Sequence, residues 1–191
     1  MVSVLATARS GSTNLSNYLS YVLGMKLVIS PFEFQQDISI LENDKLYKIL
    51  IHQQAKGYDS LFGFGEDIIT KSDKVVLLDR EDKTAQAESL VFRKQKYGND
   101  FYKYHIRENY GELSKEFVTE SKFHFTEHHL ALKQLSEKYN IPLFTYEQIY
   151  YRDGLKQLSD YLEIEISEKY KKIYISEYNK SRIYDVNNTL I

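Results

Sequence analysis

The 191-residue chain contains no cysteine and no long apolar run. Without cysteine it forms no disulfide, uses no thiolate in catalysis and binds no metal through sulfur, while the redox compartment stays undetermined. No stretch approaches the roughly 20 apolar residues that a membrane-spanning helix requires. The chain begins with a predicted core strand rather than with a basic segment that leads into an apolar signal. We therefore expect a soluble, cytoplasmic protein with no membrane span.

An excess of charge of either sign is also missing, since 25 lysines and arginines stand against 27 aspartates and glutamates, for a net charge of -2. A bulk surface that is not basic gives no reason to expect nucleic-acid binding, so any positive patch must be local. Hydrophobic residues make up 42% of the chain, a fraction that does not indicate disorder. We expect a single domain over residues 1–191, because the chain is too short for two full domains. The oligomeric state is left open.

The N-terminal segment joins an apolar strand, Met1 to Ala8, to a turn rich in Gly, Ser and Thr and then to a helix. From Ser12 onward apolar residues recur at helical spacing, at Leu15, Leu19, Val22 and Leu23. Backbone N–H groups at a helix N-terminus have no acceptor within the helix, and the helix dipole there favours negative charge. Such a corner attracts phosphate or sulfate. The alternative is an ordinary strand-turn-helix in which Ser12 is the N-cap.

The side chains of this turn suit an anion. Gly11 lets the backbone approach a ligand, Arg9 offers a planar and permanently charged fork, and hydroxyl donors come from Ser10, Ser12 and Thr13. A loop for ATP or GTP needs a second glycine and a lysine followed by Ser or Thr, but no lysine occurs between positions 1 and 24. The turn therefore predicts an anion site and disfavours a kinase.

A second strand and helix are predicted over Lys74–Leu90. Val75 to Leu78 is a continuous apolar run, which is typical of a parallel strand covered on both faces. Arg80 stands at the carboxyl end of this strand, where open α/β sheets bind ligands, and Ser89 lies on the following helix. The two side chains converge on one anion only if that helix folds back across the crevice. The alternative is a surface arginine paired with its acidic neighbours.

The two segments together resemble the cofactor motifs of sulfotransferases. Arg9–Asn14 is similar to the Pro-Arg-Ser-Gly-Ser-Thr loop of that family, with Ala8 where the proline is common. Arg80–Ser89 has the form Arg-x-Asp-x-x-x-Gln-Ala-x-Ser, which is most similar to the bacterial trehalose sulfotransferase type. The resemblance implies an α/β fold, a three-layer sandwich around a central, mainly parallel sheet of the P-loop NTPase-like kind. It also implies 3′-phosphoadenosine 5′-phosphosulfate (PAPS) as sulfuryl donor, its desulfated product PAP, and no metal.

By the same resemblance, the 5′-phosphosulfate contacts the loop residues Arg9, Ser10, Gly11, Ser12, Thr13 and Asn14. The 3′-phosphate contacts Arg80 and Ser89, and a C-terminal basic segment containing Lys180, Ser181 and Arg182 closes over it. A solvated charged face explains that segment equally well. Tyr146, in a Tyr-Glu pair at the end of the last predicted core strand, Ile141–Glu147, approaches the adenine by resemblance, although such a strand end is ordinary.

Two residues are predicted as the base that deprotonates the acceptor hydroxyl. Glu33 follows the predicted strand Lys26–Ser30, in a segment similar to the Pro-x-Glu-Tyr-Phe of the trehalose type, whose Glu is assigned as the base. Apolar neighbours would have to raise its pKa to make it an efficient base. His52 ends another predicted strand, where animal cytosolic sulfotransferases place their catalytic histidine, but the Lys-x-His form is absent because Leu50 stands two positions before it. Glu33 is the first choice and His52 the second.

The acceptor side is predicted in a small helical insertion near residues 98–125. Its aromatic residues form either a platform for a sugar or other ring, or the packing of a loop: Tyr102, Tyr104, His105 and Tyr110. His124 and His128 lie four apart on one face of a helix. The metalloprotease order His-Glu-x-x-His is absent, so we expect no metal site. The helix from Thr126 to Tyr139 is expected to cover the sheet.

The sequence therefore predicts a PAPS-dependent sulfotransferase that acts on a hydroxyl group. By resemblance the leading acceptors are carbohydrates and glycolipids, with small phenols, alcohols and protein tyrosines behind them. Two other classes stay open: a noncatalytic protein that binds PAP or another nucleotide and, with less support, a P-loop kinase. The sequence does not fix the acceptor, the base or the presence of activity.

Overall fold

The computed structural model describes residues 1–32, 36–97 and 114–165. Five strands form one parallel sheet in the order β2-β3-β1-β4-β5. Their bounds are β1 (Val2–Ala6), β2 (Lys26–Ile29), β3 (Lys45–Leu50), β4 (Lys74–Asp79) and β5 (Leu143–Thr145). The helices are α1 (Ser12–Leu23), α2 (Leu61–Lys71), α3 (Lys83–Tyr97), α4 (Lys115–Tyr139), α5 (Tyr146–Tyr151) and α6 (Gly154–Leu162), with a 3-10 turn at Ile38–Ile40.

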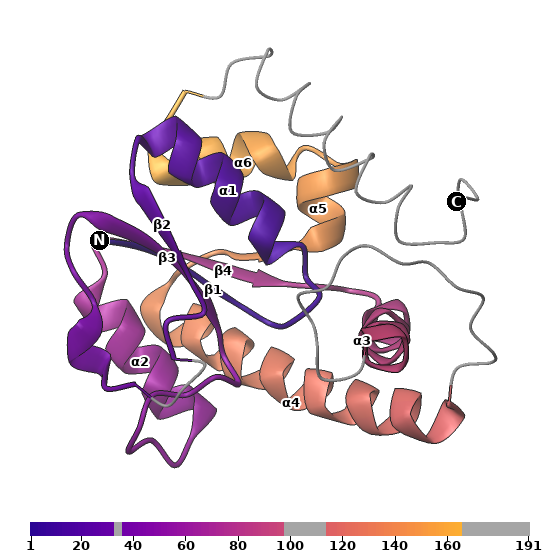
Figure 1. Ribbon diagram of the computed structural model, residues 1–191. Helices are drawn as coiled ribbons and strands as arrows, with labels where there is room; N and C mark the ends of the chain where they lie inside the picture. The colour runs from indigo at the N-terminus through magenta and orange to yellow at the C-terminus, as the bar shows by residue number, and fades with distance from the viewer. Residues whose placement is uncertain (33–35, 98–113, 166–191) are drawn as a thin grey trace.

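Helices cover both faces of the sheet (Figure 1). Helices α1, α5 and α6 lie on one face, α2 and α4 lie on the other, and α3 lies beside α4 at the end of the sheet toward which β4 points. On β1, Val4 and Ala6 pack into the first apolar layer and Leu5 packs into the second, and all three are fully buried. Burial of both faces explains the continuous apolar strands of the sequence. The expected three-layer α/β fold with a parallel sheet is confirmed.

The parallel register brings the carboxyl ends of the central strands to one edge of the sheet. Ala6, at the end of β1, is level with Leu50 of β3 and with Leu78 of β4. The polar residues that follow, Thr7 after β1 and Asp79 at the end of β4, therefore lie next to each other. This is the edge at which open α/β sheets bind their ligands.

The helix α4 is longer than expected. The sequence predicts a helix from Thr126, whereas α4 begins at Lys115, where the hydroxyl of Ser114 accepts the N–H of Phe117 and caps it. Residues 115–125 of the expected insertion are thus the first part of this helix, and residues 98–113 lie outside the described ranges. None of the helices in those ranges is long and apolar enough to cross a membrane.

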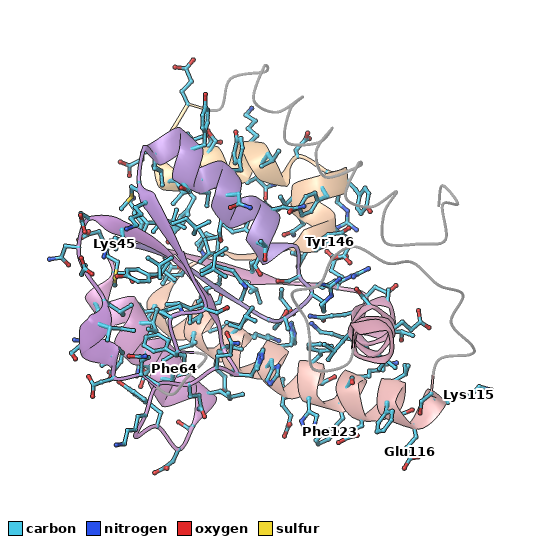
Figure 2. All side chains as sticks on the ribbon, viewed as in Figure 1. Lys45, Phe64, Lys115, Glu116, Phe123 and Tyr146 are labelled. Atoms are coloured by element: carbon cyan, nitrogen blue, oxygen red, sulfur yellow. The ribbon has the colours of Figure 1, made fainter. Side chains whose placement is uncertain are left out.

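The helices α2 and α4 pack closely because a glycine faces a leucine between them. A Cβ at Gly65 would lie 2.3 Å from Cδ1 of Leu135. A glycine that weakens the isolated helix therefore permits the approach of its neighbour. Next to it, Phe64 fills the layer between α2 and the sheet and is fully buried (Figure 2).

Candidate functional site

The turn between β1 and α1 has an unusual backbone. Arg9 and Gly11 both have positive φ values, of 61° and 76°, although Arg9 is not a glycine. Gly11 is the N-cap of α1 and offers no side chain to bond the first turn, whereas α2 and α4 are capped by serine hydroxyls. The first backbone N–H groups of α1 have no acceptor within the helix. A helix N-terminus without a side-chain cap is a position at which anions commonly bind in proteins.

Two tyrosines of α5 press on this turn. The hydroxyl of Tyr150 donates to the carbonyl oxygen of Gly11 at 3.1 Å. A Cβ at Gly11 would lie 2.8 Å from Cε2 of Tyr150 and 2.9 Å from Cδ2 of Tyr146. Figure 2 shows Tyr146 near the start of α1, at the edge of the sheet described above. Glycine is therefore required here both by the backbone angle and by the two rings.

The other predicted loop residues differ in their exposure. The hydroxyl of Ser10 is buried and donates to the carbonyl oxygen of Thr7 at 2.7 Å, so this side chain stabilises the turn itself. Ser12 is buried at the start of α1, whereas Thr13 is exposed and Asn14 is partly exposed. The Ser10 hydroxyl is thus used inside the protein, in contrast to the expectation that it would contact a ligand.

The two predicted anion motifs meet in the structure. Nε of Arg9 donates to Oγ of Ser89 at 3.0 Å, and the two residues are 80 positions apart in the sequence. Arg9 comes from the turn after β1 and Ser89 from α3, so α3 folds back over the edge of the sheet. The sequence paired Ser89 with Arg80 through a shared anion, whereas the contact seen here joins Ser89 to Arg9.

Arg80 lies over the ring of Tyr146. Its guanidinium carbon is 4.8 Å from the ring centroid, and its Nε is 3.7 Å from Oε1 of Glu147. This Nε is buried and makes no hydrogen bond with the described residues. The alternative from the sequence was a surface ion pair between Arg80 and an acidic neighbour such as Glu81. In the structure Glu81 pairs with Arg152 instead. Arg80 is therefore held between the ring of Tyr146 and the carboxylate of Glu147.

The carboxylate of Asp79 joins three elements at this edge. It is 1% exposed. Its Oδ1 accepts the hydroxyl of Thr7 at 2.8 Å, and its Oδ2 lies 2.5 Å from Nζ of Lys83 and 2.7 Å from Nδ1 of His129. The amide nitrogen of Gln86 donates to the same Thr7 hydroxyl at 2.8 Å. A buried charge is costly unless it is paired. The Asp79 carboxylate meets this requirement through its contacts with Thr7, Lys83 and His129.

The predicted base His52 lies on an open hollow. The hollow has a volume of about 370 Å³ and is lined by Phe32, His52 and residues 53–58. The His52 ring stacks on His128 of α4, with ring centroids 5.4 Å apart and an angle of 15° between the planes. Burial, and then the nearby His52, lower the pKa of His128 to about 4. Glu33, the other predicted base, lies outside the described ranges, directly after Phe32 of the hollow.

Several predicted residues lie outside the described ranges. They are Glu33, Tyr102, Tyr104, His105, Tyr110, Lys180, Ser181 and Arg182. Of the two histidines considered for a metal, His124 contacts Glu127 and His128 stacks on His52, while the neighbouring His129 bonds Asp79. The residues of the described ranges contain no group of three His, Asp or Glu side chains suited to a metal ion.

The sequence interpretation missed Asp79, Gln86 and His129 as site residues. One signal was available for Asp79, because it is the polar last residue of an otherwise apolar strand, at the edge where ligands bind. Gln86 stands inside the second motif, three positions before Ser89. His129 gave no such signal, since its partner is 50 residues away.

The fold is similar to that of a solved sulfotransferase, mouse SULT7A1 in complex with PAP. The TM-score is 0.61 at 12% sequence identity, over 95% of this chain and 64% of the mouse protein, so this chain spans less than two thirds of that protein's length. No protein-family model matches the sequence, and no curated protein matches it either. At this identity the similarity establishes architecture: the chain has a sulfotransferase-like α/β fold.

Proposed function

We propose that this protein is a PAPS-dependent sulfotransferase, which transfers the sulfuryl group of PAPS to a hydroxyl of a carbohydrate or glycolipid. The observation that supports it most strongly is the contact of Arg9 with Ser89 at 3.0 Å. Two motifs that are each similar to a different phosphate-binding segment of sulfotransferases lie within hydrogen-bond distance. PAPS carries an anionic group at both ends of its ribose, so a donor site for it needs two such segments side by side.

In this proposal the phosphosulfate binds at the start of α1. The backbone N–H groups after Gly11 and the guanidinium of Arg9 donate to it, as expected for an anion at a helix N-terminus. Arg80 and Ser89 hold the 3′-phosphate, to which the Arg80 guanidinium offers a planar, permanently charged group. Tyr146, whose ring packs against the Arg80 guanidinium, contacts the adenine. The C-terminal residues Lys180, Ser181 and Arg182 stay part of the proposal as a cover for the 3′-phosphate.

The chemistry requires stabilisation of charge as the bond between sulfur and the bridging oxygen breaks. The acceptor oxygen attacks sulfur and gives up its proton, the S–O bond to the phosphate breaks, and PAP leaves with the bonding electrons. Donors fixed before the reaction stabilise this developing charge, and such electrostatic terms are usually the largest in catalysis. Arg9 has the position for this role, since it belongs to the turn and is held by Ser89.

The acceptor binds on the side of the sheet edge where the hollow opens. Its lining includes the aromatic rings of Phe32 and Tyr58 and the polar side chains of His52 and Gln53. Glu33 and His52 stay the sequence-based proposals for the base. The trehalose type of acceptor rests on two sequence resemblances, the motif of residues 80–89 and the segment that contains Glu33.

Binding and turnover test this proposal separately. In calorimetry we expect PAP to bind, and in a thermal-shift assay PAP is expected to stabilise the chain where ATP with magnesium does not. Stabilisation by ATP with magnesium alone would favour a kinase. Labelled PAPS is then incubated with a panel of trehalose, other sugars, glycolipids, phenols and tyrosine peptides. PAP binding without transfer to any of them would make the protein a noncatalytic nucleotide binder.

A further inference from the structure

One carboxylate separates the anion-binding turn from a histidine of α4. Oδ1 of Asp79 accepts a hydrogen bond from the hydroxyl of Thr7 at 2.8 Å, and Oδ2 lies 2.7 Å from Nδ1 of His129. Thr7 is the first residue after β1 and opens the turn, so the His129 ring lies two contacts from the proposed anion site. Asp79 is 1% exposed, whereas 37% of the His129 side chain is open to solvent. The His129 ring is thus fixed by a buried carboxylate, while part of the ring is open to solvent.

The partners of Asp79 fix the tautomer of His129. An ionised carboxylate only accepts hydrogen bonds, and Oδ2 of Asp79 also accepts the ammonium of Lys83 at 2.5 Å. Nδ1 of His129 must then carry the hydrogen that faces Asp79. In the neutral ring, Nε2 keeps its lone pair and is the nitrogen able to accept a proton. A carboxylate that orients an imidazole in this way is the arrangement of a general base.

We propose that His129, positioned by Asp79, is the base that takes the proton of the acceptor hydroxyl. This inference rests on the proposed function. As the acceptor oxygen forms its bond to sulfur, its proton passes to Nε2 of His129, the bond between sulfur and the bridging oxygen breaks, and PAP leaves with the electron pair. The resulting imidazolium is stabilised by the Asp79 carboxylate and later releases its proton to water.

His129 suits this role better than the other two histidines of the cluster. His128 is half-buried and its Nδ1 bonds no described group, an environment that disfavours the protonated ring. His129 has a buried carboxylate, Asp79, that sets the orientation of its ring. Among the described residues, Asp79 of β4 bonds His129, Lys83 of α3 contacts the same carboxylate oxygen, and His128, the preceding residue of α4, stacks on His52.

The test uses His129→Asn, because asparagine keeps an N–H donor toward Asp79 but has no lone pair at the position of Nε2. The control is His124→Asn, on the exposed face of the same helix. The readout is release of labelled sulfate from PAPS to water, which needs no knowledge of the acceptor, together with PAP affinity by calorimetry. We expect His129→Asn to lose on the order of a hundredfold or more in rate with unchanged PAP affinity. The fall of the wild-type rate on acidification disappears in this variant.

A purely structural His129 would be rescued by asparagine, so a wild-type rate in His129→Asn overturns the inference and leaves the proposed function intact. Loss of rate in Glu33→Gln or His52→Asn with full activity in His129→Asn assigns the base elsewhere. If His129→Asn does not fold, ¹⁵N histidine spectra of the wild-type chain decide, since an Nε2–H tautomer at His129 contradicts the proposal. A chain that binds no PAP, or that binds it and releases no sulfate to water or to any acceptor, overturns the proposed function as well.

Discussion

The hydroxyl of Tyr150 donates to the carbonyl oxygen of Gly11 at 3.1 Å, across 139 residues of sequence. Through this hydrogen bond the short helix α5 packs against the turn that precedes α1. Since Tyr146 of the same helix carries Arg80 on its ring, α5 connects the turn to the second motif. The geometry of the proposed donor site therefore depends on residues from both ends of the described chain.

Replacement of Gly11 by alanine is expected to destabilise the fold more than the same change at Gly24. Both glycines have positive φ, of 76° and 63°, so alanine costs about 1–2 kcal/mol in either place. The new methyl meets nothing within 4 Å at Gly24, but at Gly11 it meets Tyr150 and Tyr146. Such overpacking typically adds about 1–3 kcal/mol. Urea unfolding measures both variants, and equal losses of stability would contradict the packing described here.

Removal of the Arg9 side chain is expected to reduce sulfuryl transfer by roughly a hundred- to a thousandfold, the usual cost of losing one charge-stabilising donor. The rate is measured as transfer of labelled sulfate from PAPS. Arg152→Ala is the matched control, because this arginine is exposed and pairs with Glu81. If Arg9→Ala keeps the rate of Arg152→Ala, the turn does not bind the reacting group.

Arg80→Ala is expected to weaken PAP binding more than it slows transfer at saturating donor. Hydrogen bonds to charged groups contribute about 1.5–3 kcal/mol, which corresponds to roughly a ten- to hundredfold loss of affinity. Calorimetry with PAP measures this directly, and Lys133→Ala on the exposed face of α4 controls for the loss of one positive charge. Unchanged affinity in Arg80→Ala would mean that the 3′-phosphate binds elsewhere.

The stability of the fold is expected to decline on acidification in part because of His128. Its pKa is lowered from 6.5 to about 4, first by burial and then by His52. The folded state thus binds fewer protons than the unfolded state between these values, so this group removes stability as pH falls from 6.5 to about 4 and adds no further change below that. His128→Phe keeps an aromatic ring against His52 and removes the titration.

Thermal unfolding between pH 7 and 4 checks this expectation. The decline of the melting temperature is expected to be shallower in His128→Phe than in the wild-type chain, while His124→Phe keeps the wild-type slope. His124 is the matched control because it is exposed on the same helix. Parallel slopes in all three proteins would show that His128 titrates alike in the folded and unfolded states.

Much of the fold could be predicted from local sequence patterns. The spacing of apolar residues predicts the strand before Thr7 and the helix after Gly11, and the Gly- and Ser-rich sequence between them predicts the turn. All three signals lie within a short stretch of the chain. The apolar run that ends at Asp79 predicted a parallel strand for the same reason. These elements depend on neighbours in sequence, which is the information that a single chain provides.

The contacts of the site were harder to predict because they join distant segments. Tyr146 was expected at the end of a strand, but Thr145 and Gln148 form a capping box that starts a helix there. The motif is visible in the sequence only as Thr-x-x-Gln after a short strand. The pairing of Asp79 with His129 had no local signature, since it follows from the packing of α4 across the sheet edge.

Asp79 contacts both Thr7, in the turn after β1, and His129, in α4, so it connects the turn to this helix. If a ligand changes the position of Thr7, we expect the Asp79 carboxylate, and with it His129 in the middle of α4, to change surroundings. Leu130 is next to His129 and 52% exposed. Because the chain has no cysteine, a dye on Leu130→Cys would label one position alone, so its fluorescence tests whether PAP added to the chain changes the surroundings of α4.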